Sequence, residues 1–141
     1  MKELIYDFSQ PYSEEHDLAK RFIHKDLCPL CGASLSQNSW DEDTYECGVF
    51  PYDPIKQPIT HAFWFYQSVM NFGYYKPGNK PNTRRMYIFT FEGVYFREYV
   101  SGNIFNSNEF KISNLTSFDL FKIDSIVEQY DKEIGKLLLL I

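Results

Sequence analysis

Apolar residues recur with helical spacing in the first part of the chain. In residues 13–25, SEEHDLAKRFIHK, acidic residues follow Ser13 and basic residues close the segment, which complements the dipole of a helix. Ser13 is a suitable N-cap because its hydroxyl can accept a hydrogen bond from the first turn. The apolar residues that share one helical face are Leu18, Ala19, Phe22 and Ile23. The pattern predicts an amphipathic helix that packs against a sheet.

The middle of the chain has the pattern of β-strands. Segments rich in aromatic and β-branched residues predict strands at 44–50, 59–70, 85–91 and 94–100, and weaker strands at 109–113 and 117–123. Glu92 and Gly93 form a two-residue turn signal between two of these segments. Consecutive strands joined by short turns predict an antiparallel meander.

The last segment again has helical spacing. Residues 124–141, DSIVEQYDKEIGKLLLLI, predict a closing helix, and Ser125 with Glu128 fits a capping box at its start. The predicted fold class is therefore α+β: an antiparallel sheet flanked by an N-terminal and a C-terminal helix.

The composition supports a folded core. Hydrophobic residues make up 44% of the 141-residue chain, and a chain of this length buries about two-thirds of its unfolded surface. A single domain, residues 1–141, is therefore expected, and folding should not require a metal. The net charge of −5 argues against a uniformly basic nucleic-acid-binding surface. An acidic surface could instead complement a basic partner.

The sequence predicts a cytoplasmic protein. It has no signal-peptide h-region and no run of the roughly 18 apolar residues that a membrane span needs. Its three cysteines are an odd number, which fits a reducing compartment better than a disulfide framework. The abundance of Asn, Lys, Ile, Tyr and Phe suggests an AT-rich genome, from which we infer a phage or mobile-element origin.

The three cysteines form the clearest chemical pattern. Cys28 and Cys31 are separated by two residues in the segment CPLCG, where a tight turn would let both thiolates converge. This segment resembles the first knuckle of zinc ribbons and rubredoxin-like sites, and Cys47 falls where such ribbons begin their second knuckle. The resemblance covers residues 28–50 and implies a tetrahedral metal site.

The fourth ligand departs from the ribbon pattern. Phe50 stands where the fourth cysteine would be, and a phenylalanine cannot bind a metal. His61 is the preferred replacement, because a neighbouring strand could bring it across from Cys47. His24, at the end of the first predicted helix, is the second choice. Three thiolates and one imidazole would form a closed structural Zn²⁺ site.

A metal-free interpretation also stays open. A free cysteine packs like a small apolar residue, and a domain of this size can fold without a metal. In this interpretation the zinc-ribbon-like knuckle is degenerate and its cysteines only fill space. Its role is structural in both interpretations.

A second candidate site is the basic segment 74–86, YYKPGNKPNTRRM, which reads as a long hairpin loop. Basic and aromatic side chains together could hold phosphates and stack bases, or dock an acidic protein surface. The predicted binding residues are Tyr74, Tyr75, Lys76, Lys80, Arg84 and Arg85. The alternative is a solvated loop without a binding role.

No enzyme motif is present. The sequence lacks a phosphate-binding loop, a dinucleotide-binding glycine pattern, H-E-x-x-H and G-x-S-x-G. It therefore favours a small acidic binding protein that acts through protein–protein contact, as inhibitors and immunity-type proteins do. The alternatives are a zinc-ribbon-like nucleic-acid-binding module and a small enzyme without a recognisable motif.

Overall fold

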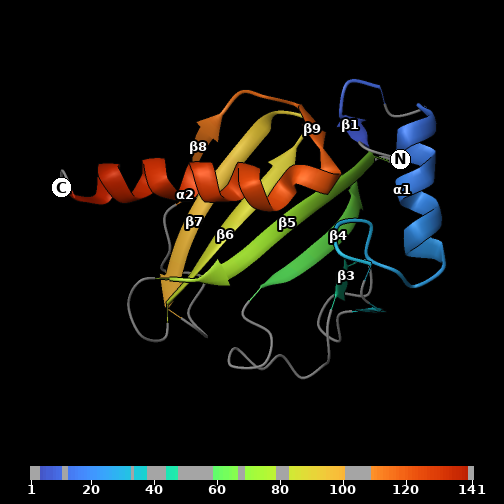
Figure 1. Cartoon of the computed structure of the whole chain (residues 1–141), viewed down its shortest axis with the longest axis horizontal. Coiled ribbons are helices and arrows are strands. Elements are labelled where there is room, and N and C mark those ends of the chain that lie inside the picture. The colour runs from blue at the N-terminus through green and yellow to red at the C-terminus, as the bar shows by residue number, and fades with distance from the viewer. Residues whose placement is uncertain are drawn as a thin grey trace.

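The computed structural model has an α+β fold, as the sequence predicts (Figure 1). It describes residues 4–10, 13–32, 34–37, 44–47, 59–66, 69–78, 83–100 and 109–139. Its helices in these ranges are α1 (Glu14–His24), the short 3-10 helix η2 (Leu120–Lys122) and α2 (Ile123–Leu139). Its strands are β1 (Ile5–Asp7), β2 (Leu35–Gln37), β3 (Thr44–Cys47), β4 (Thr60–Tyr66), β5 (Val69–Pro77), β6 (Thr83–Thr90), β7 (Gly93–Val100), β8 (Glu109–Ser113) and β9 (Ser117–Asp119).

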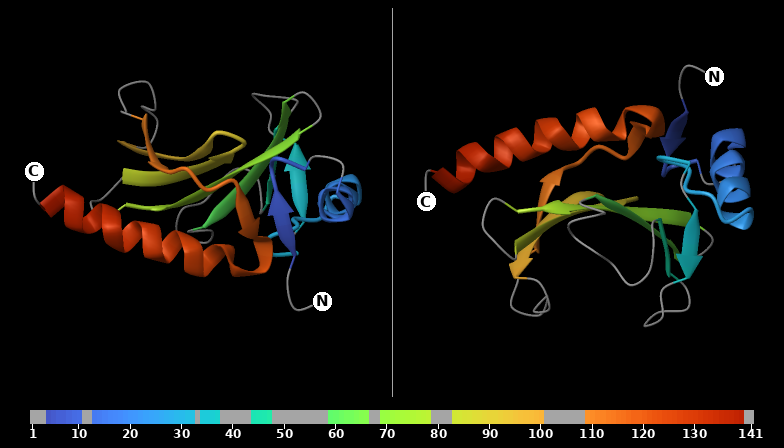
Figure 2. Two further views of the ribbon diagram at one scale, coloured as in Figure 1. Left: turned by 90° about the horizontal axis from the view of Figure 1, so that it is seen from above. Right: turned by 60° about the horizontal axis from the view of Figure 1, so that its bottom comes forward.

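Seven of the described strands form one antiparallel sheet in the order β2-β3-β4-β5-β6-β7-β8. Strand order follows chain order, so the predicted meander is confirmed. The two other described strands, β1 and β9, pair with each other as a separate antiparallel ribbon. α2 crosses one face of the sheet, and α1 lies beside the end that carries β2 and β3 (Figures 1 and 2).

The main core lies between the sheet and α2. Side chains alternate between the two faces of a strand, and those facing α2 are largely aromatic. The rings of Phe72 and Phe89 stack at 4.6 Å between centroids, and Phe118 meets Phe89 edge-on at 5.0 Å. The hydroxyl of Tyr6 donates a 2.8 Å hydrogen bond to the Met70 carbonyl oxygen, which ties the β1–β9 ribbon to the sheet.

The predicted first helix is confirmed as α1. Ala19 and Ile23 of its apolar stripe are buried, and Leu18 and Phe22 are half-buried. Among the helices in the described ranges, none is long and apolar enough to cross a membrane.

Two predictions in the middle of the chain are wrong. The strand predicted at 59–70 is two strands, β4 and β5, and most of the loop predicted at 74–86 is the paired ends of β5 and β6. The break between β4 and β5 falls at a Gln-Ser pair, where no glycine, proline, asparagine or aspartate signals a turn. Because the residues on both sides of this pair are apolar, the sequence pattern predicts a single strand over 59–70.

The predicted capping box is also wrong. α2 begins at Ile123, so Ser125 lies inside the helix. Asp119 is the cap: its Oδ1 accepts hydrogen bonds from the backbone N–H groups of Phe121 and Leu4, at 3.1 and 3.0 Å. Asp119 caps η2, which leads directly into α2. Because η2 starts at Leu120, β9 ends at Asp119, and the strand predicted at 117–123 is too long. The β1–β9 ribbon and β2 were not predicted.

Candidate metal centre

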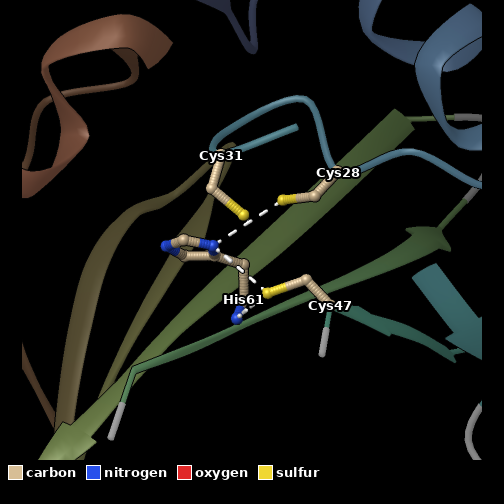
Figure 3. Close-up of side chains that lie close together, drawn as sticks. All are labelled: Cys28, Cys31, Cys47 and His61. Carbon is tan, nitrogen blue, oxygen red and sulfur yellow. Dashed lines mark hydrogen bonds between the residues drawn. The ribbon is translucent and has the colours of Figure 1, made fainter. Parts of the chain in front are cut away.

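Cys28, Cys31, Cys47 and His61 come together at the end of the sheet next to α1 (Figure 3). Their ligand atoms, three Sγ atoms and one imidazole nitrogen, all lie within 4.8 Å of one another. Three separate pieces of chain supply them: the knuckle between α1 and β2, the end of β3, and the start of β4. The fold thus assembles a four-ligand cluster from residues that are far apart in sequence.

The C-cap of α1 directs the backbone into the knuckle, residues 28–32. The backbone N–H groups of Asp26 and Leu27 donate to the carbonyl oxygens of Ile23 and Phe22, at 3.0 and 2.8 Å. Asp26 itself has a left-handed φ of 59°. This pair of bonds around a left-handed residue is a Schellman C-cap. It ends the helix at His24, four residues before Cys28.

A second tight turn closes the knuckle itself. Gly32 has a φ of 75°, in the region that favours glycine. Its backbone N–H donates a 2.7 Å hydrogen bond to the carbonyl oxygen of Cys28. The bridge between Leu27 and Ser34 then brings the chain back beside itself. Both cysteines of the C-x-x-C segment are therefore held on one side of the turn.

Strand register supplies the other two ligands. Glu46 of β3 pairs with Ala62 of β4, and continuing this antiparallel register places Cys47 beside His61. The backbone N–H of His61 donates to Cys47 Sγ at 3.1 Å. The sequence prediction that a neighbouring strand brings His61 to Cys47 is confirmed.

The distances fit tetrahedral coordination. Zn–S bonds of about 2.3 Å and a Zn–N bond of about 2.05 Å at a tetrahedral angle require N···S edges of about 3.6 Å. Nδ1 of His61 lies 3.6 Å from Cys28 Sγ and 3.4 Å from Cys47 Sγ. The cluster is thus already close to the size of a Zn²⁺ coordination shell.

The thiols and the imidazole of the cluster shift one another's pKa values. A hydrogen bond with Cys47, burial and the nearby negative charge raise the pKa of Cys28, and the same hydrogen bond lowers the pKa of Cys47. Burial alone would lower the pKa of His61, but hydrogen bonds to the sulfur atoms of Cys31 and Cys47 raise it to about 9. Negative sulfur thus stabilises positive charge within the cluster, which is the electrostatic setting that a cation needs.

The cluster is compatible with a metal ion, and an ion held by all four side chains would have no coordination position left for a substrate. Cys28, Cys47 and His61 are buried, whereas Cys31 is exposed at the knuckle. Four protein ligands complete a tetrahedral shell, whereas catalytic zinc sites keep one position for water or substrate. The four side chains therefore match the ligand set of a closed coordination shell.

His24, the second choice for the fourth ligand, does not contribute to the described cluster. His24 is exposed in the last turn of α1 and is not among the clustered residues. Phe50 lies outside the described residues.

Three of the predicted binding residues make contacts with α2. The Tyr74 hydroxyl donates to Asp124 Oδ1 at 2.6 Å, and Lys76 Nζ donates to Asp131 Oδ2 at 2.8 Å. Arg85 donates to Asp131 at 2.7 Å and also to Glu98 of β7 at 2.8 Å. Burial and the bond to Asp124 raise the pKa of Tyr74, so its hydroxyl stays protonated as the donor.

The remaining predicted binding residues are placed differently. Tyr75 and Arg84 lie on the sheet face away from α2, where Tyr75 is half-buried and Arg84 is buried. Lys80 lies outside the described residues. Their role in partner binding stays a prediction.

Sequence reasoning missed the acidic residues of α2 that receive these contacts. Asp124, Glu128 and Asp131 are spaced i, i+4 and i+7, so they share one face of the helix. This acidic stripe and the basic segment 74–86 together could have predicted that the helix pairs with that segment.

Comparisons of this chain with protein-family models, with curated proteins and with solved structures find no match. The four side chains and their geometry alone therefore support the assignment of a metal-binding cluster.

Proposed function

We propose that Cys28, Cys31, Cys47 and His61 hold one structural Zn²⁺ ion. The observation that carries this proposal is the fit of the 3.4 and 3.6 Å N···S distances to a tetrahedral shell. Three thiolates and an imidazole favour Zn²⁺ over the hard cations Mg²⁺ and Ca²⁺, which prefer oxygen ligands.

The ion would act as a cross-link. It would join the knuckle between α1 and β2 to strands β3 and β4. The edge strand of this end of the sheet, β2, has only three residues. Structural zinc sites in small peptides contribute about 10–16 kcal/mol of binding free energy at neutral pH. In this larger domain, much of the core lies under α2 and away from the knuckle. The ion would therefore stabilise the knuckle and the neighbouring strands β2 to β4, while the rest of the domain would fold without it.

Zinc content tests this proposal. Protein purified without an affinity tag is expected to carry one equivalent of zinc by elemental analysis, and His61→Ala is expected to lose it. His24→Ala is the matched control: it removes an exposed histidine close to the knuckle in sequence, and it should keep one equivalent. Wild-type protein that takes up no zinc from a zinc-supplemented buffer would establish the metal-free knuckle instead.

We further propose that the protein works by binding another protein. Large apolar side chains are exposed in β1, in the β6–β7 turn, between β8 and β9, and in η2. These segments are neighbours, because Phe118 of β9 packs against Phe89 near the end of β6 and β1 pairs with β9. The exposed side chains are Ile5 (40%), Phe91 (51%), Leu115 (61%) and Phe121 (47%), which we call the ribbon patch. An exposed apolar patch of this kind is a common mark of a protein interface.

The charges around the ribbon patch indicate the kind of partner. Asp119 is the register partner of Ile5, Asp7 lies two residues further along β1, and Glu92 follows Phe91 in the turn. Acidic groups therefore border the apolar side chains, in keeping with the net charge of −5. A partner with an apolar centre and a basic rim would be complementary.

A capture experiment tests protein binding. Immobilised wild-type protein is expected to retain a stoichiometric partner from lysate of the source cell, after nuclease treatment and at raised salt. Leu115→Ser combined with Phe121→Ser should abolish this retention. Ile59→Ser, at an equally exposed apolar residue (43%) outside the ribbon patch, should not. Equal loss in all variants, or retention in none, would contradict a role for the ribbon patch.

A nucleic-acid-binding role is the second candidate. Arg21, His24 and Lys25 are exposed at the end of α1, next to the knuckle. Binding through phosphates would release counterions, so retained nucleic acid should be lost log-linearly as salt rises. Arg21→Ala with Lys25→Ala would then reduce both the affinity and the salt dependence.

A further inference from the structure

Tyr74 lies between the metal cluster and α2. It is the register partner of His61 across β4 and β5, and the two ring centroids are 5.0 Å apart. At the other end of the side chain, the hydroxyl donates a 2.6 Å hydrogen bond to Asp124 in the first turn of α2. Tyr74 is only 3% exposed, so its ring has little freedom to move independently of these neighbours.

The imidazole of His61 lacks the usual support for a metal ligand. Its Nδ1 faces the sulfur atoms, so metal binding at Nδ1 would leave the proton on Nε2. Nε2 is buried and has no hydrogen-bond partner among the described residues. Metal-bound histidines normally donate this proton to a carboxylate, carbonyl or water that fixes the ring. Here the ring of Tyr74 packs against the imidazole and is the contact that can orient it.

In the part of the chain that the structure describes, side-chain hydrogen bonds join α2 to the sheet at two places. One is the Tyr74–Asp124 hydrogen bond. The other is Asp131, two turns further along the helix, which accepts hydrogen bonds from Lys76, Arg85 and the hydroxyl of Tyr87. Tyr74 and Tyr87 therefore make the same kind of bond to α2 from neighbouring strands, and Tyr74 also contacts His61.

We propose that Tyr74 is a positioning residue for the His61 ligand and couples metal binding to the docking of the first turn of α2. This inference rests on the proposed zinc site. A metal that fixes His61 also fixes the ring of Tyr74, and the hydroxyl of Tyr74 then holds Asp124. Because coupling between two equilibria is reciprocal, loosening this end of α2 must weaken metal binding by the same factor.

Tyr74→Phe and Tyr87→Phe form a matched pair for the test. Each removes one hydroxyl that donates to an aspartate of α2, and each keeps the aromatic ring. Zinc affinity, measured by competition with a chromophoric chelator, is expected to fall about tenfold in Tyr74→Phe, within the usual range of coupling between two sites. In Tyr87→Phe it should stay within about twofold of wild type, because the Tyr87 hydroxyl donates to Asp131, whereas the ring that packs on His61 belongs to Tyr74.

Hydrogen exchange supplies a readout that a general loss of stability would not reproduce. Zinc should increase amide protection in residues 123–128 of the wild type and of Tyr87→Phe, and this increase should be absent in Tyr74→Phe. Asp124→Asn leaves Tyr74 intact and weakens the same hydrogen bond, so it should reproduce the Tyr74→Phe result if that variant folds poorly.

Two outcomes would overturn the inference, and they are distinguishable. Wild-type protein that binds no zinc would remove the proposed site and the coupling together. Wild-type protein that binds zinc, with equal affinity and equal zinc-induced protection in Tyr74→Phe and Tyr87→Phe, would leave the zinc site standing and disprove the coupling.

Discussion

Two residues with left-handed backbone, Asp26 and Gly32, shape the knuckle that carries Cys28 and Cys31. Asp26 ends α1 and Gly32 closes the knuckle, and both have positive φ, at 59° and 75°. Glycine adopts this conformation at no steric cost, whereas a residue with a Cβ atom loses roughly 1–2 kcal/mol. Gly32 is therefore suited to its position, and Asp26 carries strain. A helix C-cap normally places glycine where this chain has Asp26.

Asp26→Gly should stabilise the protein by about 1 kcal/mol, because both hydrogen bonds of the cap come from the backbone and are retained. Urea denaturation would measure the change. Asp17→Gly, at an exposed position inside α1, is the control and should instead cost up to about 1 kcal/mol. Destabilisation by Asp26→Gly would mean that the Asp26 side chain supports the knuckle in a way that its backbone geometry does not require.

The residue scale also shows how far the sequence could predict the site. Cys28, Cys31 and Cys47 follow from the resemblance of CPLCG to a ribbon knuckle. His61 follows from the expectation that consecutive strands pair, and the β3–β4 register confirms it. The contact of Tyr74 with His61 could not be predicted. It depends on the pairing of β4 with β5, and the sequence between these strands has no glycine or proline to mark where one ends and the other begins.

At the scale of the elements, acidic residues of α2 determine which side chains of the sheet face the helix. Arg85 is nearly buried, with a side chain that is 3% exposed, and it is held between Asp131 and Glu98. Burial alone would raise the pKa of Asp131, but hydrogen bonds from Lys76, Tyr87 and Arg85 hold it below its usual value. The charge of Asp131 therefore stabilises the folded state.

Asp131→Asn should reduce the free energy of unfolding by about 2–3 kcal/mol at pH 7, because it leaves Arg85 buried with only Glu98 as an acidic partner. A carboxyl whose pKa is lowered by folding stabilises above its unfolded pKa of about 3.9, and this stabilisation is lost as pH falls through the folded value. The difference between wild type and Asp131→Asn should therefore shrink below about pH 4. Urea denaturation of both proteins at pH 7 and pH 3 would measure it. A difference that does not change with pH would assign the effect to packing instead of charge.

Secondary-structure patterns in the sequence predicted the elements better than their connections. Both helices and most strands appear where hydrophobic periodicity placed them. The basic segment 74–86 read as a loop because Pro, Gly and Asn cluster at its centre. That cluster marks only the short connection between β5 and β6, and the flanking Tyr74, Lys76 and Arg85 face α2. Charged side chains such as Lys76 and Arg85 suggest a loop in the sequence, because their acidic partner Asp131 on α2 is known only from the structure.

At the scale of the whole molecule, two features stand outside the main core under α2. Cys28, Cys31, Cys47 and His61 cluster where the knuckle after α1 meets β3 and β4, while the ribbon patch exposes apolar side chains in β1, in the β6–β7 turn, between β8 and β9, and in η2. α2 starts beside the β1–β9 ribbon, where Asp124 of its first turn accepts a hydrogen bond from Tyr74, and it runs across the sheet from there (Figure 2). The proposed zinc would stabilise one end of the molecule, and the proposed partner would cover another part of its surface.

Cobalt substitution tests the zinc site most directly, because the absorption spectrum of Co²⁺ reports both the geometry and the ligands. Apo-protein titrated with Co²⁺ is expected to bind one equivalent, with intense d–d bands of tetrahedral coordination and sulfur-to-cobalt charge-transfer bands of three thiolates. Zn²⁺ should then displace the Co²⁺ stoichiometrically. A weak octahedral spectrum, or no spectral change at all, would show that the four side chains only pack together and that the knuckle holds no metal.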